Sequence, residues 1–228
     1  MNVQGIFKKV WDTEDLMTSF DGMCFHRPFE YNDNWKTSDG SWFHVDQNGH
    51  TKPDKLCVQG FLNFFESGVD DGGLIVVPGS HKIFKDIFAS RPKLSKFGDF
   101  VPLSSDESVW NGEIKAAGLE PIKVCCGRGD FLLWDSRTIH CNEPARTARE
   151  LPQEGALLTP RRLVAYVCMT PASRLTPEIR ELRVKAYQDG NTTSHWPEDV
   201  FSPSVRMNKA EGYSPVLLSD GQKALIPL

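Results

Sequence analysis

The sequence predicts a mainly β protein, an antiparallel sandwich or barrel with flanking helices. Several short runs of strand-forming residues are separated by turns rich in glycine, proline and aspartate, which is typical of such folds. A length of 228 residues suits one β-rich domain. Hydrophobic residues make up 39% of the chain and charged residues 25%, which is enough apolar material for one sizeable core.

The expected strands follow a mixed N-terminal region. That region contains a short amphipathic segment, Thr13 to Phe20, for which we expect a helix with Thr13 as its N-cap. A loop rich in Pro, Asp, Asn and Gly comes next. The expected strands cover residues 42–47, 57–65, 73–77, 121–125, 131–134 and 162–168. The run at 57–65 alternates well enough to be half buried.

The last part of the chain is expected to hold a helix and a tail. Residues 177–188 are predicted to be helical, with Thr176 as N-cap and Pro177 at the first position. The tail after Ser202 contains several prolines and is expected to be extended and irregular. We therefore expect a single domain over residues 1–228, with its core at about 42–170 and the helix and irregular tail at 171–228.

Charge and composition exclude some classes of partner. The net charge is −4 and no long basic block is present, which argues against nucleic acid as the main partner. No apolar run approaches the roughly 20 residues of a membrane span, and the first ten residues lack the apolar stretch of a signal peptide. We expect a cytoplasmic protein that binds a small molecule, with neither nucleic acid nor membrane as a partner.

The six cysteines are expected to be reduced and buried. They are Cys24, Cys57, Cys125, Cys126, Cys141 and Cys168. Most stand inside apolar runs, and no Cys-x-x-Cys pair is present. Cys141 is the exception to watch, because it neighbours a candidate metal ligand.

The stretch from Trp42 to Gln47 contains the first chemical signal. His44 and Asp46 stand two residues apart among strand-forming neighbours, so in a strand both side chains point to one face. His140 offers a third ligand from a distant segment. Two histidines and one carboxylate form the facial triad of oxygen-activating non-haem iron enzymes. Because about 0.45 His-x-Asp pairs are expected by chance, the motif needs independent support.

That support comes from a resemblance to the phytanoyl-CoA dioxygenase family of iron(II)- and 2-oxoglutarate-dependent oxygenases. The segments that carry it, in chain order, are residues 44–47, 57–62, 71–81, 129–134 leading to His140, and 161–165. The resemblance implies a double-stranded β-helix, which is a cupin-like jelly roll, with the site in its mouth. It implies iron(II) held by His44, Asp46 and His140, with 2-oxoglutarate as cosubstrate and dioxygen as oxidant.

A count of charges shows why the site needs an arginine. Iron(II) with one carboxylate has a charge near +1, and the 2-oxoglutarate dianion brings the sum to −1. One buried cation restores neutrality, and the planar arginine fork suits a carboxylate. The resemblance favours Arg161 first and Arg162 second, and adjacent strand residues face opposite sides, so at most one should enter the site. Arg146 and Arg149 are weaker candidates.

Other polar residues have less specific signals. By the resemblance, Gln59 and Asn142 touch the cosubstrate, although ordinary strand or turn hydrogen bonding would explain them as well. Trp134 either walls the pocket near His140 or is a plain core residue. His81 ends a Pro-Gly-Ser-His turn that looks structural, and the Ser80 hydroxyl is expected to cap the turn after it.

Three histidines and one basic stretch remain. His50 lies in a polar loop, and His26 and His195 have no supporting motif. Five basic residues between His81 and Lys96 oppose a single acid, which makes either a solvated face or a cationic rim that attracts an acidic substrate. They are Lys82, Lys85, Arg91, Lys93 and Lys96, and the acid is Asp86.

The reaction that the resemblance implies is hydroxylation of an unactivated C–H bond, with release of succinate and carbon dioxide. Halogenating relatives leave the position of Asp46 vacant for chloride, so hydroxylation is expected here. Three rivals stay open: a nucleic-acid demethylase, a zinc hydrolase on a similar barrel, and a metal-binding interaction protein without catalysis.

Overall fold

The computed structural model describes residues 2–37, 42–94, 98–103, 107, 109–153, 156–199, 212 and 214–226. Its described strands are β1 (Leu16–Thr18), β2 (Met23–His26), β3 (His44–Val45), β4 (Val58–Asn63), β5 (Gly73–Val76), β6 (Val101–Pro102), β7 (Ile122–Val124), β8 (Phe131–Asp135), β9 (His140–Glu143), β10 (Arg162–Tyr166) and β11 (Met169–Pro171). Its described α-helices are α1 (Val3–Trp11), α2 (Phe84–Ala89), α3 (Pro177–Asp189) and α4 (Asp220–Leu225). Its 3₁₀ turns are η1 (Asp33–Trp35), η2 (Ser80–Lys82) and η4 (Ala172–Arg174), and η3 (Val109–Ile114) is a π-helix.

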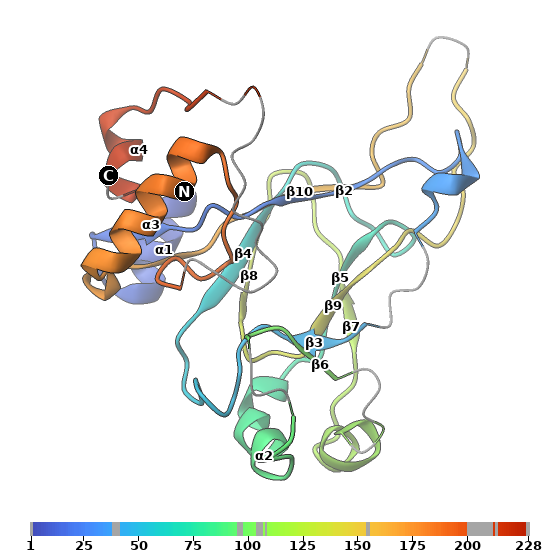
Figure 1. The fold of residues 1–228 in the computed structure, drawn as a ribbon. Helices are drawn as coiled ribbons and strands as arrows, with labels where there is room; N and C mark the ends of the chain where they lie inside the picture. Colours follow the sequence, from blue (N-terminus) through green and yellow to red (C-terminus); the bar gives the residue numbers. More distant parts are fainter. Residues whose placement is uncertain are drawn as a thin grey trace. The chain divides into compact units, whose positions relative to one another are not determined.

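The strands form two larger sheets and one small one. The orders are β2-β10-β4-β8, β6-β3-β9-β5-β7 and β1-β11. The pairs β1-β11, β2-β10, β3-β6, β3-β9, β5-β7 and β5-β9 are antiparallel. From β2 to β10 the chain passes repeatedly from one larger sheet to the other (Figure 1). This exchange of strands between two antiparallel sheets is the connectivity of a jelly roll, so the mainly β, jelly-roll prediction is confirmed.

The chain divides into two compact units. One comprises residues 1–22, 57–61 and 166–228, and the other comprises residues 23–56 and 62–165. Strands β4 and β10 have residues in both. The expectation of a single domain stays a prediction. We call the second one the β-sheet unit, because it contains β2, β3, β5, β6, β7, β8 and β9 complete. We call the first one the helical unit.

The helical unit holds α1, α3 and α4 with the β1-β11 pair. Helix α3 begins where it was predicted, with the Thr176 hydroxyl accepting the Ile179 N–H. The predicted helix from Thr13 to Phe20 is wrong: α1 ends at Trp11, and Leu16 to Thr18 pairs with β11 instead. The tail is not wholly irregular, since α4 forms within it; residues 200–211 lie outside the described residues.

A fully buried arginine holds this unit together. Arg183 of α3 donates to the carbonyls of Pro197, at 3.0 Å, and Thr18, at 2.7 Å. Its guanidinium carbon lies 4.8 Å from the centre of the Phe20 ring. Burial lowers the pKa of Arg183 to about 10, which still leaves it charged at neutral pH.

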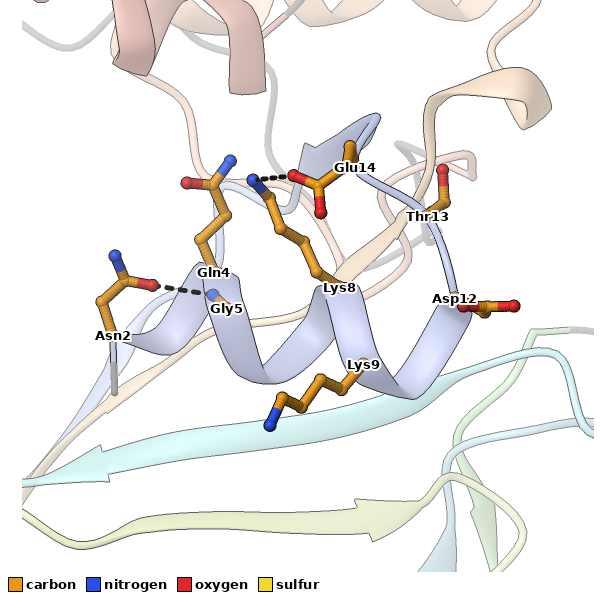
Figure 2. A pocket seen from close by; sticks show the side chains of 8 residues that line it. All are labelled: Asn2, Gln4, Gly5, Lys8, Lys9, Asp12, Thr13 and Glu14. Atoms are coloured by element: carbon orange, nitrogen blue, oxygen red, sulfur yellow. Dashed lines mark hydrogen bonds and ion pairs between the residues drawn. The ribbon is translucent and has the colours of Figure 1, made fainter.

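A shallow polar pocket of about 590 Å³ lies along α1 (Figure 2). The Asn2 side chain caps the helix by accepting from Gly5 N, and Lys8 pairs with Glu14 at 2.6 Å. These are ordinary exposed contacts of an amphipathic helix and the residues after it, so we do not treat the pocket as a candidate functional site.

The β-sheet unit has its main apolar core beneath β3 and β6. The cluster joins these strands to α2, η3 and the segment before β9, and its buried members are Val45, Val77, Phe84, Ile87, Phe88, Val101, Leu103, Val109, Ile114 and Ile139. Val45 and Ile139 are the direct neighbours of His44 and His140. Because adjacent residues of a strand face opposite sides, their burial fixes the two histidines on the other face.

Candidate metal centre

His44 and His140 are brought together by strand pairing. They are directly opposite each other in the β3-β9 ladder, and their ring centroids are 4.4 Å apart. Opposite residues of an antiparallel pair share a face of the sheet. The pairing therefore places two imidazoles, 96 positions apart in the chain, side by side.

Asp46 completes the cluster from just beyond the end of β3. Its backbone N–H is fixed by the Ser136 carbonyl at 3.1 Å. One carboxylate oxygen lies 3.6 Å from His44 Nε2 and the other lies 3.2 Å from His140 Nε2. One ligand atom from each of the three residues falls within 4.8 Å of the others. The spacing predicted a longer strand here, but β3 ends at Val45 and a bend carries the carboxylate to the site.

The two imidazoles are oriented by backbone carbonyls. His44 Nδ1 lies 3.0 Å from the Trp42 carbonyl, and His140 Nδ1 lies 2.9 Å from the Thr138 carbonyl. A carbonyl only accepts hydrogen bonds, so each Nδ1 carries the hydrogen and a neutral ring has its lone pair on Nε2. Both Nε2 atoms point toward Asp46. This is the arrangement of metal-binding histidines, whose second nitrogen is held by a backbone acceptor.

The segment before His140 is fixed by the η2 turn, a role that sequence reasoning missed. The fully buried Ser80 hydroxyl accepts the Ile139 N–H at 2.8 Å. Val77 donates its N–H to the Ile139 carbonyl, also at 2.8 Å. The expectation that Ser80 caps the turn after it is wrong, since η2 has Gly79 as N-cap and no side-chain cap. The Pro-Gly-Ser-His sequence was the available signal for a structural turn.

Aromatic rings pack around the two histidines. The Trp42 ring stacks on His44 with centroids 4.6 Å apart, and Phe100 lies 4.7 Å from His44. Trp134 lies 5.4 Å from His140. It also lines a pocket of about 380 Å³ with Leu74 and Val76. In the β5-β9 ladder these two strand residues oppose Asn142 and His140, so the pocket lies on the same face as the candidate ligands.

Arg162 is the arginine that reaches this face. Its Nη1 donates to the Asn142 side-chain oxygen and to the Gly73 carbonyl, the latter at 3.2 Å. Asn142 stands two residues after His140 on β9, so both side chains have the same orientation. The structure thus places Arg162 and Asn142 close together beside the histidine pair.

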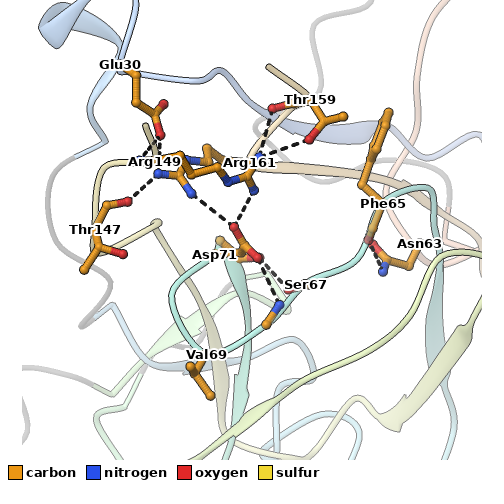
Figure 3. Close-up of polar contacts among 12 residues, drawn as sticks. Glu30, Asn63, Phe65, Ser67, Val69, Asp71, Thr147, Arg149, Thr159 and Arg161 are labelled. Carbon is orange, nitrogen blue, oxygen red and sulfur yellow. Dashed lines mark hydrogen bonds and ion pairs between the residues drawn. The ribbon is translucent and has the colours of Figure 1, made fainter. Parts of the chain in front are cut away.

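Arg161, the first choice from the sequence, is engaged elsewhere (Figure 3). Its guanidinium pairs with Glu30 and with Asp71, the latter at 3.2 Å, and it donates to the Thr147 carbonyl. Arg149 joins the same cluster through Asp71. Two carboxylates already neutralise Arg161, which is 2% exposed. The structure therefore does not favour Arg161 as the cosubstrate residue.

These contacts shift the pKa values of both acids. Burial alone would raise the pKa of Glu30, but the Arg149 backbone N–H and the Arg161 charge reverse this and lower it. The pKa of Asp71 is also lowered: burial opposes the shift, and the hydrogen bond from Arg149 leads the groups that outweigh it. The cluster is a set of ionised pairs with a structural role.

The remaining candidates are not among the three converging ligands. Gln59 is buried on β4, in the residues that belong to the helical unit. His50 packs edge-on against Phe88, with centroids 5.1 Å apart. Cys141 is fully buried, and burial, followed by the charge of Glu143, raises the pKa of its thiol to about 12. As the neighbour of His140 on β9, it faces the opposite side of the sheet from that ligand.

The other cysteines and the basic stretch follow the predictions only in part. All six cysteines are thiols, but only Cys57, Cys141 and Cys168 are buried. Cys24 and Cys126 are half-buried, and Cys125 is exposed. Within the basic stretch, Arg91 pairs with Glu113 at 2.6 Å and Lys85 pairs with Asp54 at 2.7 Å. Lys96 lies outside the described residues. The cationic rim is therefore weaker than the sequence suggested.

The chain belongs to the phytanoyl-CoA dioxygenase (PhyH) family, whose sequence model matches residues 7–150. The match includes His44, Asp46 and His140 but ends before Arg162. The Ava biosynthesis cluster protein O of Aspergillus versicolor is 31% identical over 204 residues. That alignment covers 86% of this chain and 59% of the relative. A putative phytanoyl-CoA dioxygenase of Dictyostelium discoideum is 28% identical, over 61% of this chain and 46% of the relative.

The chain thus spans about half the length of these two curated relatives. Among solved structures, it is similar to the non-heme alpha ketoglutarate dependent carbocyclase SnoK from nogalamycin biosynthesis, with 17% identity, a TM-score of 0.46, and coverage of 75% of this chain and 55% of that one. EvdO2 from Micromonospora carbonacea var. aurantiaca, solved with 2-oxoglutarate, gives 18% identity, a TM-score of 0.41, and coverage of 73% and 58%. At such TM-scores these likenesses support no conclusion about substrate or reaction.

Of the helices in the described part of the chain, none has the length and apolar character needed to cross a bilayer.

Proposed function

We propose that this chain is an iron(II)- and 2-oxoglutarate-dependent dioxygenase that hydroxylates an unactivated C–H bond of a small molecule. The observation that carries the proposal is the convergence of His44, Asp46 and His140, whose ligand atoms all lie within 4.8 Å of one another. The family membership of the chain supports it independently.

The donor set fits iron(II). Two neutral imidazole nitrogens and one carboxylate, with other positions left for exogenous ligands, are the donors of non-haem iron oxygenases. The Nδ1 contacts to the Trp42 and Thr138 carbonyls already select the ring tautomers that binding requires. When bound, iron with 2-oxoglutarate and dioxygen supplies oxidation of a C–H bond, with release of succinate and carbon dioxide. The residues of the chain hold the geometry and exclude water.

Arg162 is our choice for the residue that binds the cosubstrate, in place of Arg161. Iron(II), Asp46 and the 2-oxoglutarate dianion sum to −1, so one arginine completes neutrality. Arg162 is 2% exposed and is held by Asn142 and Gly73, which are neutral. We propose Asn142 and Gln59 as further cosubstrate residues, with the contact to Arg162 supporting Asn142.

Asp46 favours hydroxylation over halogenation, because its carboxylate occupies the ligand position that chloride would need. We propose a small-molecule substrate. It would be acidic if Lys82 and Lys93, for which the described residues provide no ion pair, contribute to its binding. We also infer a cytoplasmic location, which the six free thiols support.

An anaerobic titration tests the proposal. Iron(II) followed by 2-oxoglutarate should produce the weak visible charge-transfer band of the chelated complex. Asp46→Ala removes the only charged donor of the triad, so the band should require a higher iron(II) concentration to form. Asp54→Ala, at an exposed acid that pairs with Lys85, should leave the band unchanged.

Absence of the band from a folded wild-type protein would remove the oxygenase proposal. Metal binding without 2-oxoglutarate binding would favour the metal-binding alternative, a hydrolase or an interaction protein. If the band forms, succinate release measured against a panel of metabolites would identify the substrate.

A further inference from the structure

His26 is a histidine without a sequence motif that stands beside the proposed cosubstrate arginine. Strand β2 pairs antiparallel with β10, and in this register His26 is directly opposite Arg162. Opposite residues of an antiparallel pair share a face, with Cβ atoms about 4.5–5.5 Å apart. The imidazole is thus on the face of β10 from which Arg162 reaches Asn142.

The turn before β5 is shaped to accept the imidazole. A Cβ placed on Gly72 would lie 2.4 Å from His26 Nδ1 and 3.3 Å from the Arg162 Cβ. The His26 ring therefore packs directly against the Gly72 backbone, beside the stem of Arg162. The next residue, Gly73, supplies the carbonyl that accepts from Arg162. The glycine pair gives room to the histidine and orients the arginine.

His26 is neutral in this position. Burial lowers its pKa to about 4, and the Arg162 charge adds to the shift. Nδ1 is buried and has no hydrogen-bond partner among the described residues. Because Nδ1 faces Gly72, Nε2 on the opposite edge of the ring is the nitrogen that can contact a ligand. With its hydrogen on Nε2, the ring is a neutral donor.

We propose that His26 is a second residue of the cosubstrate site, with its Nε2–H donating a hydrogen bond to the distal carboxylate of 2-oxoglutarate beside Arg162. The proposal rests on the proposed function. A neutral donor suits this place because the arginine already completes the charge balance. A second cation would leave the loaded site positive, whereas a neutral imidazole satisfies another carboxylate lone pair at no cost in charge.

A pair of ligands tests the proposal by binding rather than by turnover. 2-Oxoglutarate and 2-oxopentanoate have the same chain length, but only the first has a distal carboxylate. Both are titrated anaerobically into the iron(II)-loaded wild-type and His26→Phe proteins, with the charge-transfer band as readout. We expect His26→Phe to weaken 2-oxoglutarate binding about tenfold, as for loss of a hydrogen bond to a charged group, and to leave 2-oxopentanoate within about twofold.

Two further variants separate contact from packing. His26→Gln keeps an N–H near the place of Nε2 and should restore part of the affinity. Gly72→Ala should displace the imidazole and reproduce the selective loss. Gly68→Ala is its matched control, because the nearest atom to an added Cβ there is an Asp71 carboxylate oxygen at 3.6 Å, an ordinary contact.

The outcomes are distinct. Equal losses for both ligands in His26→Phe, or no loss for either, would overturn the proposal while the wild-type band kept the proposed function intact. No band in the wild-type protein would remove the proposed function itself. If His26→Phe fails to fold, the comparison of Gly72→Ala with Gly68→Ala decides the question with the same two ligands.

Discussion

Arg161 and Arg162 are chain neighbours whose guanidinium groups meet different partners. Arg161, which immediately precedes β10, pairs with Glu30 in the segment after β2 and with Asp71 in the loop before β5. Arg162 instead contacts the neutral oxygens of Gly73 and Asn142. The alternation of side chains along a strand explains the division. Arg161 is paired with carboxylates, whereas Arg162 is the residue that we propose to bind the cosubstrate anion.

Substitution of each arginine by methionine should separate these roles. Arg161→Met leaves the buried Glu30 carboxylate without its ion-pair partner and leaves Asp71 with Arg149 alone. We therefore expect the free energy of unfolding to fall by about 3–5 kcal/mol. Arg162→Met should cost less stability but weaken 2-oxoglutarate binding more strongly than iron(II) binding. Urea unfolding and the anaerobic titration measure the two effects. Equal loss of stability in both variants would contradict the division.

The convergence of His44, Asp46 and His140 could be predicted from the sequence, but the different contacts of Arg161 and Arg162 could not. His44 and Asp46 are two residues apart, so in any strand their side chains point to the same face. His140 follows a strand-and-turn pattern. Arg161 and Arg162 are equivalent in type and differ only in orientation. That orientation depends on the β2-β10 register, which no local pattern reveals.

At the scale of elements, the η2 turn fixes the start of β9. The Ser80 hydroxyl and the Val77 N–H both bond the backbone of Ile139. Ile139 in turn packs in the apolar core. The turn therefore sets where β9 begins and hence where the His140 ring lies, although no residue of η2 is one of the three candidate ligands.

Ser80→Ala should weaken both the fold and metal binding. The Ile139 N–H would be buried without an acceptor, which costs about 1–3 kcal/mol. A looser start to β9 should also reduce iron(II) affinity several-fold. Ser219→Ala, at an exposed helix cap that accepts from Gln222 N, is the control for loss of a serine hydrogen bond. Unchanged metal affinity in a destabilised Ser80→Ala protein would show that η2 does not position His140.

Two elements were misplaced in the sequence prediction for physical reasons. The N-terminal helix starts after Asn2, whose side chain caps it, and not after Thr13. Leu16 and Met17 have the apolar character of a helix face, but tertiary pairing with β11 makes them a strand. The β4 run was expected to be half buried, yet five of its six residues are buried. Alternation of side chains does not show what covers each face.

At the scale of the whole molecule, the site depends on contacts far apart in the chain. The three candidate ligands come from two strand segments, and the pairing of β3 with β9 brings them together. The jelly-roll fold could be anticipated from the family resemblance, while the register and the buried ion pairs depend on tertiary pairing that no local pattern reveals. Composition and turn patterns were sufficient for the fold class because they do not depend on register.

Acid should destabilise the molecule in two stages. His26 has a folded pKa of about 4, below its ordinary value of 6.5. Between these two pH values the imidazole is protonated in the unfolded chain but neutral in the folded protein. Stability should therefore fall as the pH drops from 6.5 to 4. For Glu113, the hydrogen bond from Arg91 is the largest cause that lowers its pKa from 4.5 to about 2. Its contribution is complete above pH 4.5 and is lost as the pH falls toward 2.

Two variants assign these stages. His26→Phe should flatten the stability curve between pH 6.5 and 4, and Glu113→Gln should flatten it below pH 4.5. Urea unfolding at a series of pH values measures both, with a chelator present so that metal release does not contribute. The stages are separable because a histidine and a carboxylate start from different unfolded pKa values, although both lose stability in the same direction. An unchanged slope between pH 6.5 and 4 in His26→Phe would show that the imidazole is protonated in the folded protein, and it could not then act as a neutral donor beside Arg162.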